Sequence, residues 1–389
     1  MKKLKDVCYF YAGTGFPTQY QGKKDGVYPF YKVGDISKNV LKGNVYLKEC
    51  DNFIDKDIVD KIRGTIIPPN TIVFAKIGEA LRLNRRAITI TDCLVDNNAM
   101  GIKPNENQIN LHYFFYYMCQ LDLQKYAEST AVPSVRKSKL LEIEINFPPL
   151  EEQRRIASVL DKVSGLIDKR RRQMDRLDEL VKSEFIEMFG DPVRNPFGWE
   201  KRKLVDICTK LTDGTHFSPE SFPDGEYKYI TAKNIKEDGF DFTNLTYVTK
   251  DVHDAIYARC NPELGDVLYI KDGVTTGIAM TNSLNEPFTM LSSVALLKQN
   301  RKLILGEFLC SVLNDSEMYR NIRSNMGGAA ITRLTIKKLK EIMIILPPLK
   351  LQQQFVFIKK QADKSKDEIK KSLEKLETLK KALMQKYFG

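Results

Sequence analysis

The side chains best suited to nucleophilic catalysis or metal binding are few and scattered in this sequence. The 389 residues include three histidines, His112, His216 and His253, whose spacing matches neither a metal-ligand pattern nor a catalytic triad. The seven cysteines lie far apart and form no CxxC pair, which argues against a zinc site and against a disulfide framework. We therefore expect no catalytic and no metal site. Among the histidines, only His216, in a predicted loop, is a candidate for a ligand contact.

Three short motifs contain residue types found in enzymes that act on DNA, but each lacks part of what the chemistry needs. Residues 10–15 (FYAGTG) resemble the glycine loop of an S-adenosylmethionine methyltransferase, yet the matching later segment 211–216 has a single glycine. Asn195-Pro196-Phe197 lacks the second proline of the methyltransferase Asn-Pro-Pro motif. Residues 223–228 (PDGEYK) place two carboxylates too close in sequence to come from adjacent strands and grip one metal. With no GxxxxGK[ST] loop either, the sequence favours a protein that has no catalytic site of its own.

The charge of the chain favours a polyanionic partner. Lysine and arginine number 61 against 50 aspartate and glutamate, which gives a formal net charge of +11. A basic protein without such a partner is the alternative. The N-terminus has no apolar signal core, and no stretch approaches 18 uninterrupted apolar residues, so we expect a cytoplasmic protein that does not enter a membrane.

An internal repeat with a period near 199 residues is the main feature of the sequence. Pro148-Pro149-Leu150 recurs as Pro347-Pro348-Leu349, and each copy is followed by 40 residues that end in Phe-Gly. Upstream, residues 3–8 (KLKDVC) match residues 203–208 (KLVDIC), and residues 131–143 match residues 330–342. The chain therefore alternates globular part, helix, globular part and helix.

The two globular parts, named domain 1 (residues 1–147) and domain 2 (residues 200–346), are predicted to be of mixed α and β structure. They are separated by a first helical segment (148–190) and a linker (191–199), and a second helical segment (347–389) follows domain 2. The pattern does not determine strand order. Expected strands are Thr71–Ala75, Ile88–Thr91, Val267–Ile270 and Val294–Leu297, and expected helices are Tyr113–Leu123 and Phe308–Leu313.

Both helical segments have an apolar residue at every seventh position and contain no internal proline, as in a coiled coil. The simplest partner for each stripe is the other helix, packed antiparallel; two separate surface helices and an intermolecular coiled coil are the alternatives. Antiparallel pairing would return Gly389 to the neighbourhood of Met1 and relate the domains by a pseudo-twofold axis. A helix of about 38 residues is about 57 Å long. The stripes are Ile156, Val163 and Leu177 at a, Leu160, Ile167, Met174, Val181 and Met188 at d, and Phe355, Ala362, Ile369, Leu376 and Leu383 in the second helix, with Arg170 and Glu184 as polar exceptions.

Three loops per domain match across the repeat and are candidates for contact with double-stranded DNA. They are residues 14–19 and 213–219 (loop 1), residues 76–86 and 271–277 (loop 2), and residues 129–139 and 327–338 (loop 3). Arginine commonly pairs with guanine, and threonine can touch the thymine methyl group. For each basic residue a solvated surface charge is the alternative. The candidate contact residues are Thr14, Thr18, Gln19, Lys76, Arg82, Arg85, Arg86, Ser134 and Arg136 in domain 1, and Thr215, His216, Lys271, Thr275, Thr276, Thr332 and Arg333 in domain 2.

Different side chains in matched loops are what two different specificities would need. Loop 2 has three arginines in domain 1 and two threonines in domain 2. Two readers at the ends of long helices would contact separate short sites, at least one duplex turn (about 34 Å) apart. We therefore predict a bipartite target, with a spacer of fixed length and free sequence, and helices that act as the ruler.

Over essentially its whole length the sequence resembles the specificity subunits of type I restriction–modification systems. The motifs that carry the resemblance are residues 148–157 (PPLEEQRRIA), 213–216 (DGTH), 265–268 (GDVL), and 331–332 with 346–349. Two departures stand out: the second copy reads LKLQQQ at 349–354, and the first copy lacks the DGTH turn. Each departure could alter local contacts with DNA or with other subunits.

The resemblance implies two target-recognition domains separated by conserved helices that form a coiled coil. It also implies assembly with two modification (methyltransferase) subunits and with restriction (translocase–nuclease) subunits. S-adenosylmethionine would then bind to the modification subunits, and ATP and magnesium to the restriction subunits, with no cofactor in this chain. A self-contained DNA methyltransferase or nuclease, and a coiled-coil scaffold that never touches DNA, are the competing classes.

Overall fold

The computed structural model describes residues 2–128, 132–324 and 333–389, and its internal contacts divide the chain into two units. Unit 1 comprises residues 1–173 and 369–389, and unit 2 comprises residues 174–368. The two long helices, α7 (Leu150–Phe189) and α12 (Leu349–Phe388), each begin in one unit and end in the other. The contact division therefore cuts both helices near their middles, whereas the sequence-based boundaries assign each helix whole.

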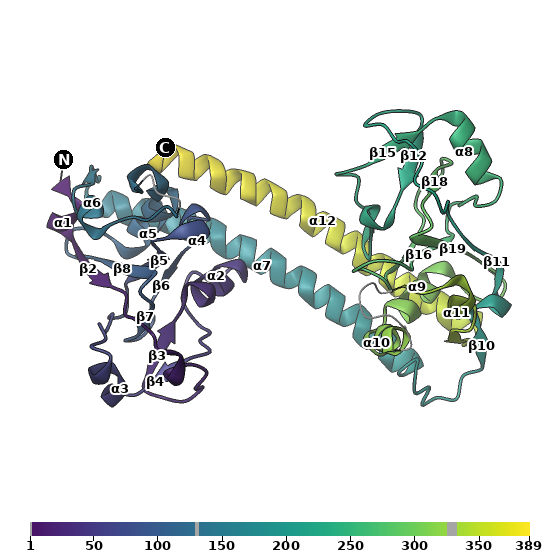
Figure 1. The fold of residues 1–389 in the computed structure, drawn as a ribbon, viewed down its shortest axis with the longest axis horizontal. Helices are drawn as coiled ribbons and strands as arrows, with labels where there is room; N and C mark the ends of the chain where they lie inside the picture. Colours follow the sequence, from purple (N-terminus) through teal and green to yellow (C-terminus); the bar gives the residue numbers. More distant parts are fainter. Residues whose placement is uncertain (1, 129–131, 325–332) are drawn as a thin grey trace. The chain divides into compact units, whose positions relative to one another are not determined.

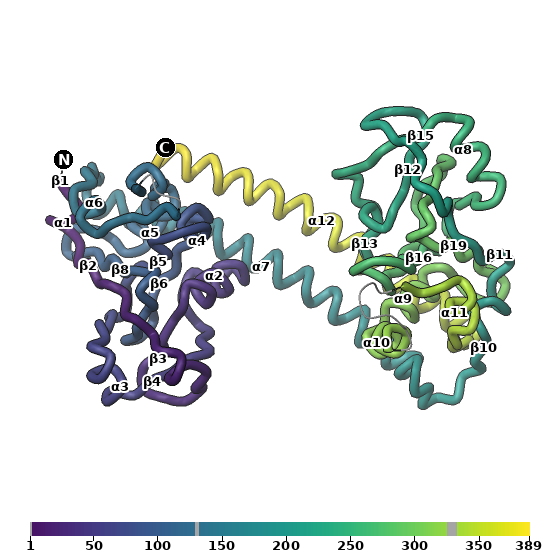
Figure 2. Tube along the Cα trace, in the orientation of Figure 1, coloured from purple at the N-terminus to yellow at the C-terminus, as the bar shows by residue number. Residues whose placement is uncertain are grey.

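Domain 1 is built on an antiparallel sheet of four strands, which lie side by side in Figure 2. The strand order is β2 (Cys8–Ala12), β8 (Ala99–Pro104), β5 (Ile72–Ala75) and β6 (Arg86–Ile88). A second sheet has the order β4 (Phe53–Ile54), β3 (Tyr28–Tyr31) and β7 (Leu94–Val95), and β1 (Lys2–Lys3) pairs with β9 (Glu144–Ile145). The α-helices of domain 1 are α1 (Leu4–Val7), α2 (Val33–Leu41), α3 (Lys56–Lys61), α4 (Gly78–Arg82), α5 (Leu111–Gln120) and α6 (Lys137–Leu141), and the 3-10 turns are η1 (Thr18–Tyr20) and η2 (Leu123–Tyr126).

Domain 2 repeats this arrangement (Figure 1). Its four-stranded sheet has the order β11 (Cys208–Asp213), β19 (Val294–Gln299), β16 (Val267–Ile270) and β17 (Ala279–Thr281). Its second sheet has the order β15 (Thr246–Val248), β12 (Tyr227–Ile230) and β18 (Thr289–Met290), β10 (Lys201–Lys203) pairs with β20 (Met343–Ile345), and a hairpin joins β13 (Ile235–Lys236) to β14 (Gly239–Phe240). The helices are η3 (Leu204–Ile207), η4 (Ala232–Asn234), α8 (Lys250–Tyr257), α9 (Gly306–Asn314), α10 (Ser316–Ser324) and α11 (Ile336–Lys340).

The four-stranded and three-stranded sheets of the two domains have corresponding strand orders and directions, and domain 2 adds the β13–β14 hairpin. In both, the first strand of the four-stranded sheet pairs with the last, and the middle strand of the small sheet pairs parallel with one neighbour and antiparallel with the other. The internal repeat is thus a repeat of topology.

Most of the elements expected from the sequence are confirmed, with shifted boundaries. The strands at 71–75, 267–270 and 294–297 and both expected helices are present. The strand expected at Ile88–Thr91 is wrong: β6 covers Arg86–Ile88. Beyond β6 the backbone of Thr89 still bonds the neighbouring chain at Thr71, but the regular strand ends there and Ile90 is half exposed.

In unit 1 the end of α12 packs antiparallel along the start of α7. Leu383, Met384, Tyr387 and Phe388 contact the core that contains Leu160. Further along, Arg171 of α7 pairs with Glu377 of α12 at 2.8 Å. The Phe388 ring lies 5.1 Å from that of Tyr113 in α5. The last residues of the chain therefore complete the core of the domain with which the chain begins.

In unit 2 the start of α12 packs antiparallel along the end of α7. Phe185 and Phe189 of α7 contact Phe355 of α12, with ring centroids 5.4 and 5.7 Å apart, and all three are buried. Lys366 pairs with Asp178 further along. Within each unit, the two helices thus form the predicted antiparallel coiled-coil pair. The heptad positions are buried most completely in the first half of each helix, at Ile156, Leu160, Val163, Ile167, Phe355 and Ala362.

Candidate nucleic-acid interface

Loops 2 and 3 are joined by the same backbone hydrogen bond in both domains. In domain 1 the amide of Val135 donates to the carbonyl of Lys76 at 2.9 Å. In domain 2 the amide of Leu334 donates to the carbonyl of Lys271 at 2.8 Å. The fold therefore brings together two segments that the sequence separates by about 60 residues, at the end of the central strand β5 or β16.

At the start of loop 1, each domain needs a glycine (Gly13 just before the loop in domain 1, Gly214 within it in domain 2) because two backbones approach closely. A Cβ atom on Gly13 would lie 1.9 Å from the carbonyl oxygen of Asp96, and one on Gly214 would lie 2.0 Å from that of Met290. The following residues, Thr14 and Thr215, donate their amides across this contact at 2.8 Å. Packing accounts for the glycine at 13, so the motif at 10–15 does not need a cofactor to explain it.

A cluster of charges ties the three loops of domain 2 together. The carboxylate of Asp213, in loop 1, is nearly buried and lies 3.4 Å from the ammonium group of Lys271, in loop 2. Lys271 also pairs with Asp272 at 2.9 Å, and Asp272 pairs with Arg333 of loop 3 at 3.3 Å. Because a buried charge is costly unless it is paired, this network holds the loops in one arrangement.

Two further side chains approach the same carboxylate oxygen of Asp213. His216 lies 3.2 Å away with its side chain 60% exposed, and Arg259, which follows α8, lies 3.4 Å away and is half exposed. Arg259 also donates to the hydroxyl of Thr212 and the carbonyl of Gly214. Domain 2 therefore holds one imidazole and one guanidinium group in fixed positions at its surface.

Among the residues of domain 1 that the structure describes, there is no equivalent of this charge cluster. Ala12 pairs with β8 where Asp213 pairs with β19, so the central carboxylate is missing. Lys76 is half-buried, whereas the corresponding Lys271 is buried. The two domains therefore share a backbone arrangement but differ in the charges beneath their loops.

The structure places the predicted contact residues in three groups. Four are partly exposed: Lys76, Arg85, Ser134 and Thr275. Six are exposed: Thr18, Gln19, Arg82, Arg136, His216 and Arg333. Five are buried, namely Thr14, Arg86, Thr215, Lys271 and Thr276, and Thr332 lies outside the described residues.

Arg86, a predicted DNA-contact residue of loop 2, is buried in the structure. It is 2% exposed and stacks over the Phe74 ring at 4.8 Å. Its guanidinium group donates to the carbonyl of Arg85 and to the side-chain oxygen of Asn84, and burial lowers the pKa of Arg86 to about 10. The side chain therefore supports the loop that carries Arg85, and it is not available for a direct contact. The buried side chains of Thr14, Thr215, Thr276 and Lys271 are likewise not available for a direct contact.

Sequence reasoning missed Arg259 and Arg323. Arg323, in α10, donates to the carbonyls of Val274 and Thr276 at 3.3 and 3.1 Å and to the hydroxyl of Tyr319 at 2.7 Å. Both arginines lie at least 45 residues from the loop residues that they bond. No local motif marks them, so only the fold could have found them.

Each long helix is attached to its domain through one buried glutamine. The side chain of Gln153 accepts from the amide of Asn110 and donates to the carbonyls of Gln108 and Pro148. Gln352 makes the same three bonds in the second repeat, to the amide of Leu305 and the carbonyls of Leu303 and Pro347. This residue stands three positions after Leu150 or Leu349 in both copies. Because the glutamine bonds the domain in the same way in both copies, the Pro-Pro-Leu motif recurs together with this glutamine.

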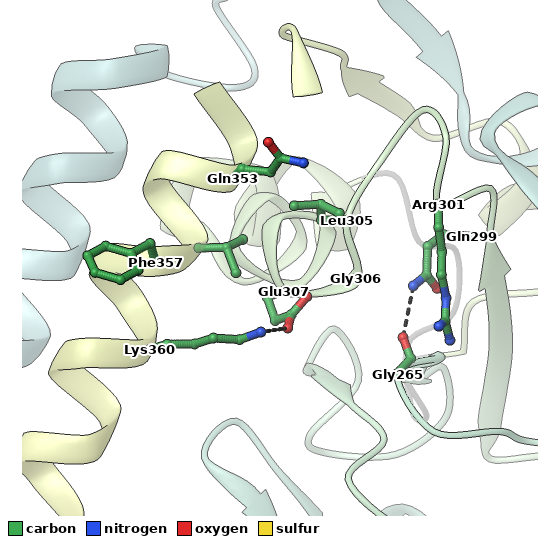
Figure 3. A pocket seen from close by; sticks show the side chains of 10 residues that line it. Gly265, Gln299, Arg301, Leu305, Gly306, Glu307, Gln353, Phe357 and Lys360 are labelled. Atoms are coloured by element: carbon green, nitrogen blue, oxygen red, sulfur yellow. Dashed lines mark hydrogen bonds and ion pairs between the residues drawn. The ribbon is translucent and has the colours of Figure 1, made fainter. Parts of the chain in front are cut away.

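In each repeat an ion pair also joins the long helix to its domain. The helix supplies the acidic partner in the first repeat and the basic partner in the second. In unit 1 the Nδ1 atom of His112 lies 2.8 Å from Asp161 of α7, and Nε2 lies 2.6 Å from the Tyr46 hydroxyl. In unit 2 Lys360 of α12 pairs with Glu307 of α9 at 2.8 Å, on the wall of a cavity of about 460 Å³ (Figure 3). The helix–domain attachments are therefore alike in geometry and different in electrostatics.

The residues of the three enzyme-like motifs have structural roles in the described parts of the chain. The side chain of Asn195, at φ +53°, bonds the backbone of Trp199 within the linker turn. Residues 223–226 form a bend that leads into β12. Across the described ranges, no group of three or more His, Cys, Asp or Glu side chains is arranged to hold a metal ion, and no helix is long and apolar enough to cross a membrane.

The fold and the loops together define a class of protein. It is an internally duplicated α+β protein with two domains, each with its own set of loops, and with two long paired helices. The family model for the type I restriction modification DNA specificity domain matches residues 1–177 and 196–381. The chain belongs to this family, the specificity subunits of type I restriction–modification systems.

Individual relatives agree with this membership. The specificity subunit of the type I restriction enzyme MjaIX from Methanocaldococcus jannaschii is 23% identical, over 91% of this chain and 84% of that protein. The EcoBI specificity subunit from Escherichia coli is 20% identical, over 99% of this chain and 84% of that protein. The crystal structure of a type I S subunit from M. genitalium has the same fold, with a TM-score of 0.61 and 17% identity over 100% of this chain and 95% of that one.

Proposed function

We propose that this chain selects the DNA on which a type I restriction–modification enzyme acts, by reading a bipartite sequence with its two domains. Each domain reads one short half-site of double-stranded DNA through loops 1, 2 and 3. The chain is a non-catalytic adaptor that also serves as the scaffold for the other subunits.

One observation supports the bipartite reading most directly. The same backbone bond joins loops 2 and 3 in both domains, yet the side chains carried by these loops differ. In these two loops domain 1 presents Arg82, Arg85 and Arg136, and domain 2 presents Thr275 and Arg333; loop 1 of domain 2 adds His216. A duplicated framework with different surface chemistry is what two unlike half-sites require, because base edges are distinguished by hydrogen-bond pattern and by the thymine methyl group.

The long helices support a spacer of fixed length. Each has 40 residues and, at about 1.5 Å per residue, is about 60 Å long. Since helices stiffen one another when paired, we propose that their length sets the distance between the half-sites.

Partners and cofactors follow from family membership and from the duplication. Two repeats offer two similar attachment positions, which fits two modification subunits, and restriction subunits join in the complete enzyme. S-adenosylmethionine binds to the modification subunits, and ATP and magnesium bind to the restriction subunits.

The test is a selection from randomised DNA duplexes with the full-length chain assembled with its modification subunits. We expect two short defined stretches separated by a constant number of undefined base pairs, and binding that weakens steeply as salt rises. Replacing residues 1–147 by those of a relative should change one stretch and leave the other intact. A single continuous motif, or no preference, would overturn the proposal. Transfer of labelled methyl groups by the purified chain alone would overturn its non-catalytic part.

A further inference from the structure

Loop 2 of domain 2 presents an apolar side chain where a polar one is normally found. Val274 is 90% exposed, the largest exposed fraction among the large apolar side chains in the described residues. The charged residues of the same loop turn inward, since Lys271 is buried and Asp272 is paired with Lys271 and Arg333. The loop therefore exposes an isopropyl group to solvent, while its two charged side chains are paired with each other.

The backbone around Val274 is held firmly. The amide of Thr276 donates to the carbonyl of Gly273 at 3.1 Å and closes a turn, and the amide of Gly277 donates to the carbonyl of Ile270 at 2.8 Å. Arg323 bonds the carbonyl of Val274 itself. A Cβ atom on Gly277, which has φ +114°, would lie 2.5 Å from the Tyr319 ring, so the loop lies directly against α10. The backbone at Val274 is therefore held in place before any partner arrives, which reduces the entropy lost on binding.

The surroundings of Val274 favour a polyanion over an apolar protein surface. The only acid in residues 271–277 is the paired Asp272. Exposed basic side chains stand on the adjoining loops, with Arg333 on loop 3 and His216 on loop 1. These charges would hold the loop against a phosphate backbone.

The chemistry of an isopropyl group narrows the contact further. It offers a phosphate neither charge nor hydrogen bond, and covering a phosphate with it would remove water without compensation. The apolar group that a base pair offers in the major groove is the 5-methyl group of thymine. We propose that Val274 contacts a thymine methyl group in the half-site read by domain 2 and makes that position specific for thymine. This inference rests on the proposed function.

The test uses duplexes in which single thymines of the selected sequence are replaced by deoxyuridine, which removes only the methyl group. For the full-length chain, one such replacement in the domain 2 half-site should weaken binding about fourfold, the effect of losing one methyl group from an apolar contact. Val274→Ala should weaken binding to the normal duplex by a similar factor and should no longer distinguish thymine from deoxyuridine there. Leu264→Ala, a half-exposed apolar side chain of domain 2 outside the three loops, is the matched control and should retain the difference.

Several results would overturn the inference. The first is a domain 2 half-site that requires no thymine. The second is a Val274→Ala protein that still distinguishes thymine from deoxyuridine. The third is a Val274→Ala protein that binds DNA more weakly while the wild-type protein is insensitive to the methyl group, as expected for a side chain wedged between bases. Unchanged DNA binding with weaker binding of modification subunits would assign Val274 to a protein contact instead. A bipartite selected sequence with any of these results contradicts the inference alone, whereas absence of any selected sequence contradicts the proposed function as well.

Discussion

At the scale of single residues, burial decides which charged side chains support the loops and which are available to DNA. Lys271 and Arg86 were both predicted to contact DNA, yet both are buried and bonded beneath their loops. Their neighbours Arg333 and Arg85 remain accessible. Two predictions follow from this division.

Lys271→Met should destabilise unit 2 strongly, because Asp213 and Asp272 would lose the cation that compensates them. Removing one partner of a buried pair costs about 3–5 kcal/mol. Trp199, the only tryptophan of the chain, packs against the core of unit 2, so its fluorescence during urea unfolding reports the loss. Lys250→Met, which breaks an exposed pair with Asp254, is the control and should change stability by less than about 1 kcal/mol. Equal effects would contradict the role assigned to Lys271.

Arg85→Ala should weaken binding to the selected sequence by about 1–3 kcal/mol if the side chain reads a base edge. The loss should disappear on duplexes whose domain 1 half-site is already altered, because the contact is then absent. Arg194→Ala, in the linker, removes an exposed arginine outside the loops and serves as the control. A loss that is the same on every duplex would show that Arg85 contributes charge without specificity.

At the scale of elements, the attachment of each long helix to its domain is the main structural finding. A glutamine and an ion pair fix the helix at the same place in both repeats. The geometry is repeated although the charges are exchanged, which indicates that position matters here more than the sign of each charge.

Gln352→Met should preserve volume while leaving the amide of Leu305 and the carbonyls of Leu303 and Pro347 without their partner. Each buried unsatisfied group costs about 1–3 kcal/mol, so we expect a total loss of at least about 2 kcal/mol in the unfolding of unit 2, again followed by Trp199 fluorescence. Gln354→Met, on the exposed side of the same turn, should be neutral. If both variants behave alike, the glutamine is not the attachment point.

His112 should make the attachment in unit 1 sensitive to pH. Its hydrogen bond to Asp161 raises the pKa of His112 above the ordinary value of 6.5. The resulting stability is fully present below pH 6.5 and is lost as pH rises through the folded pKa, because the neutral imidazole no longer donates from both nitrogens, to Asp161 and to Tyr46. Titration of the histidines by NMR should show a pKa above 6.5 that disappears in His112→Asn. A His112 pKa at or below 6.5 would contradict the geometry.

At the scale of the whole molecule, the proposed ruler makes a prediction about length. Inserting one heptad into α7 after Gln173 and one into α12 after Glu368 should lengthen the pair by about 10 Å. At about 3.4 Å per base pair, the undefined spacer should grow by about three base pairs in a new selection from randomised duplexes. Insertion into α7 alone should disrupt pairing and abolish selective binding. An unchanged spacer after the double insertion would contradict the ruler.

The sequence by itself determined the repeat, the two long helices and their antiparallel pairing, because these depend on local periodicity and on segments that match in order. It also placed the three loops, and with them Arg82, Arg85, Arg136, His216 and Arg333, all of which are accessible. Only the tertiary structure decided the strand order, the burial of Arg86 and Lys271, and the roles of Gln153, Arg259 and Arg323. These properties depend on tertiary contacts, and a local pattern carries no information about which group will lie against a side chain.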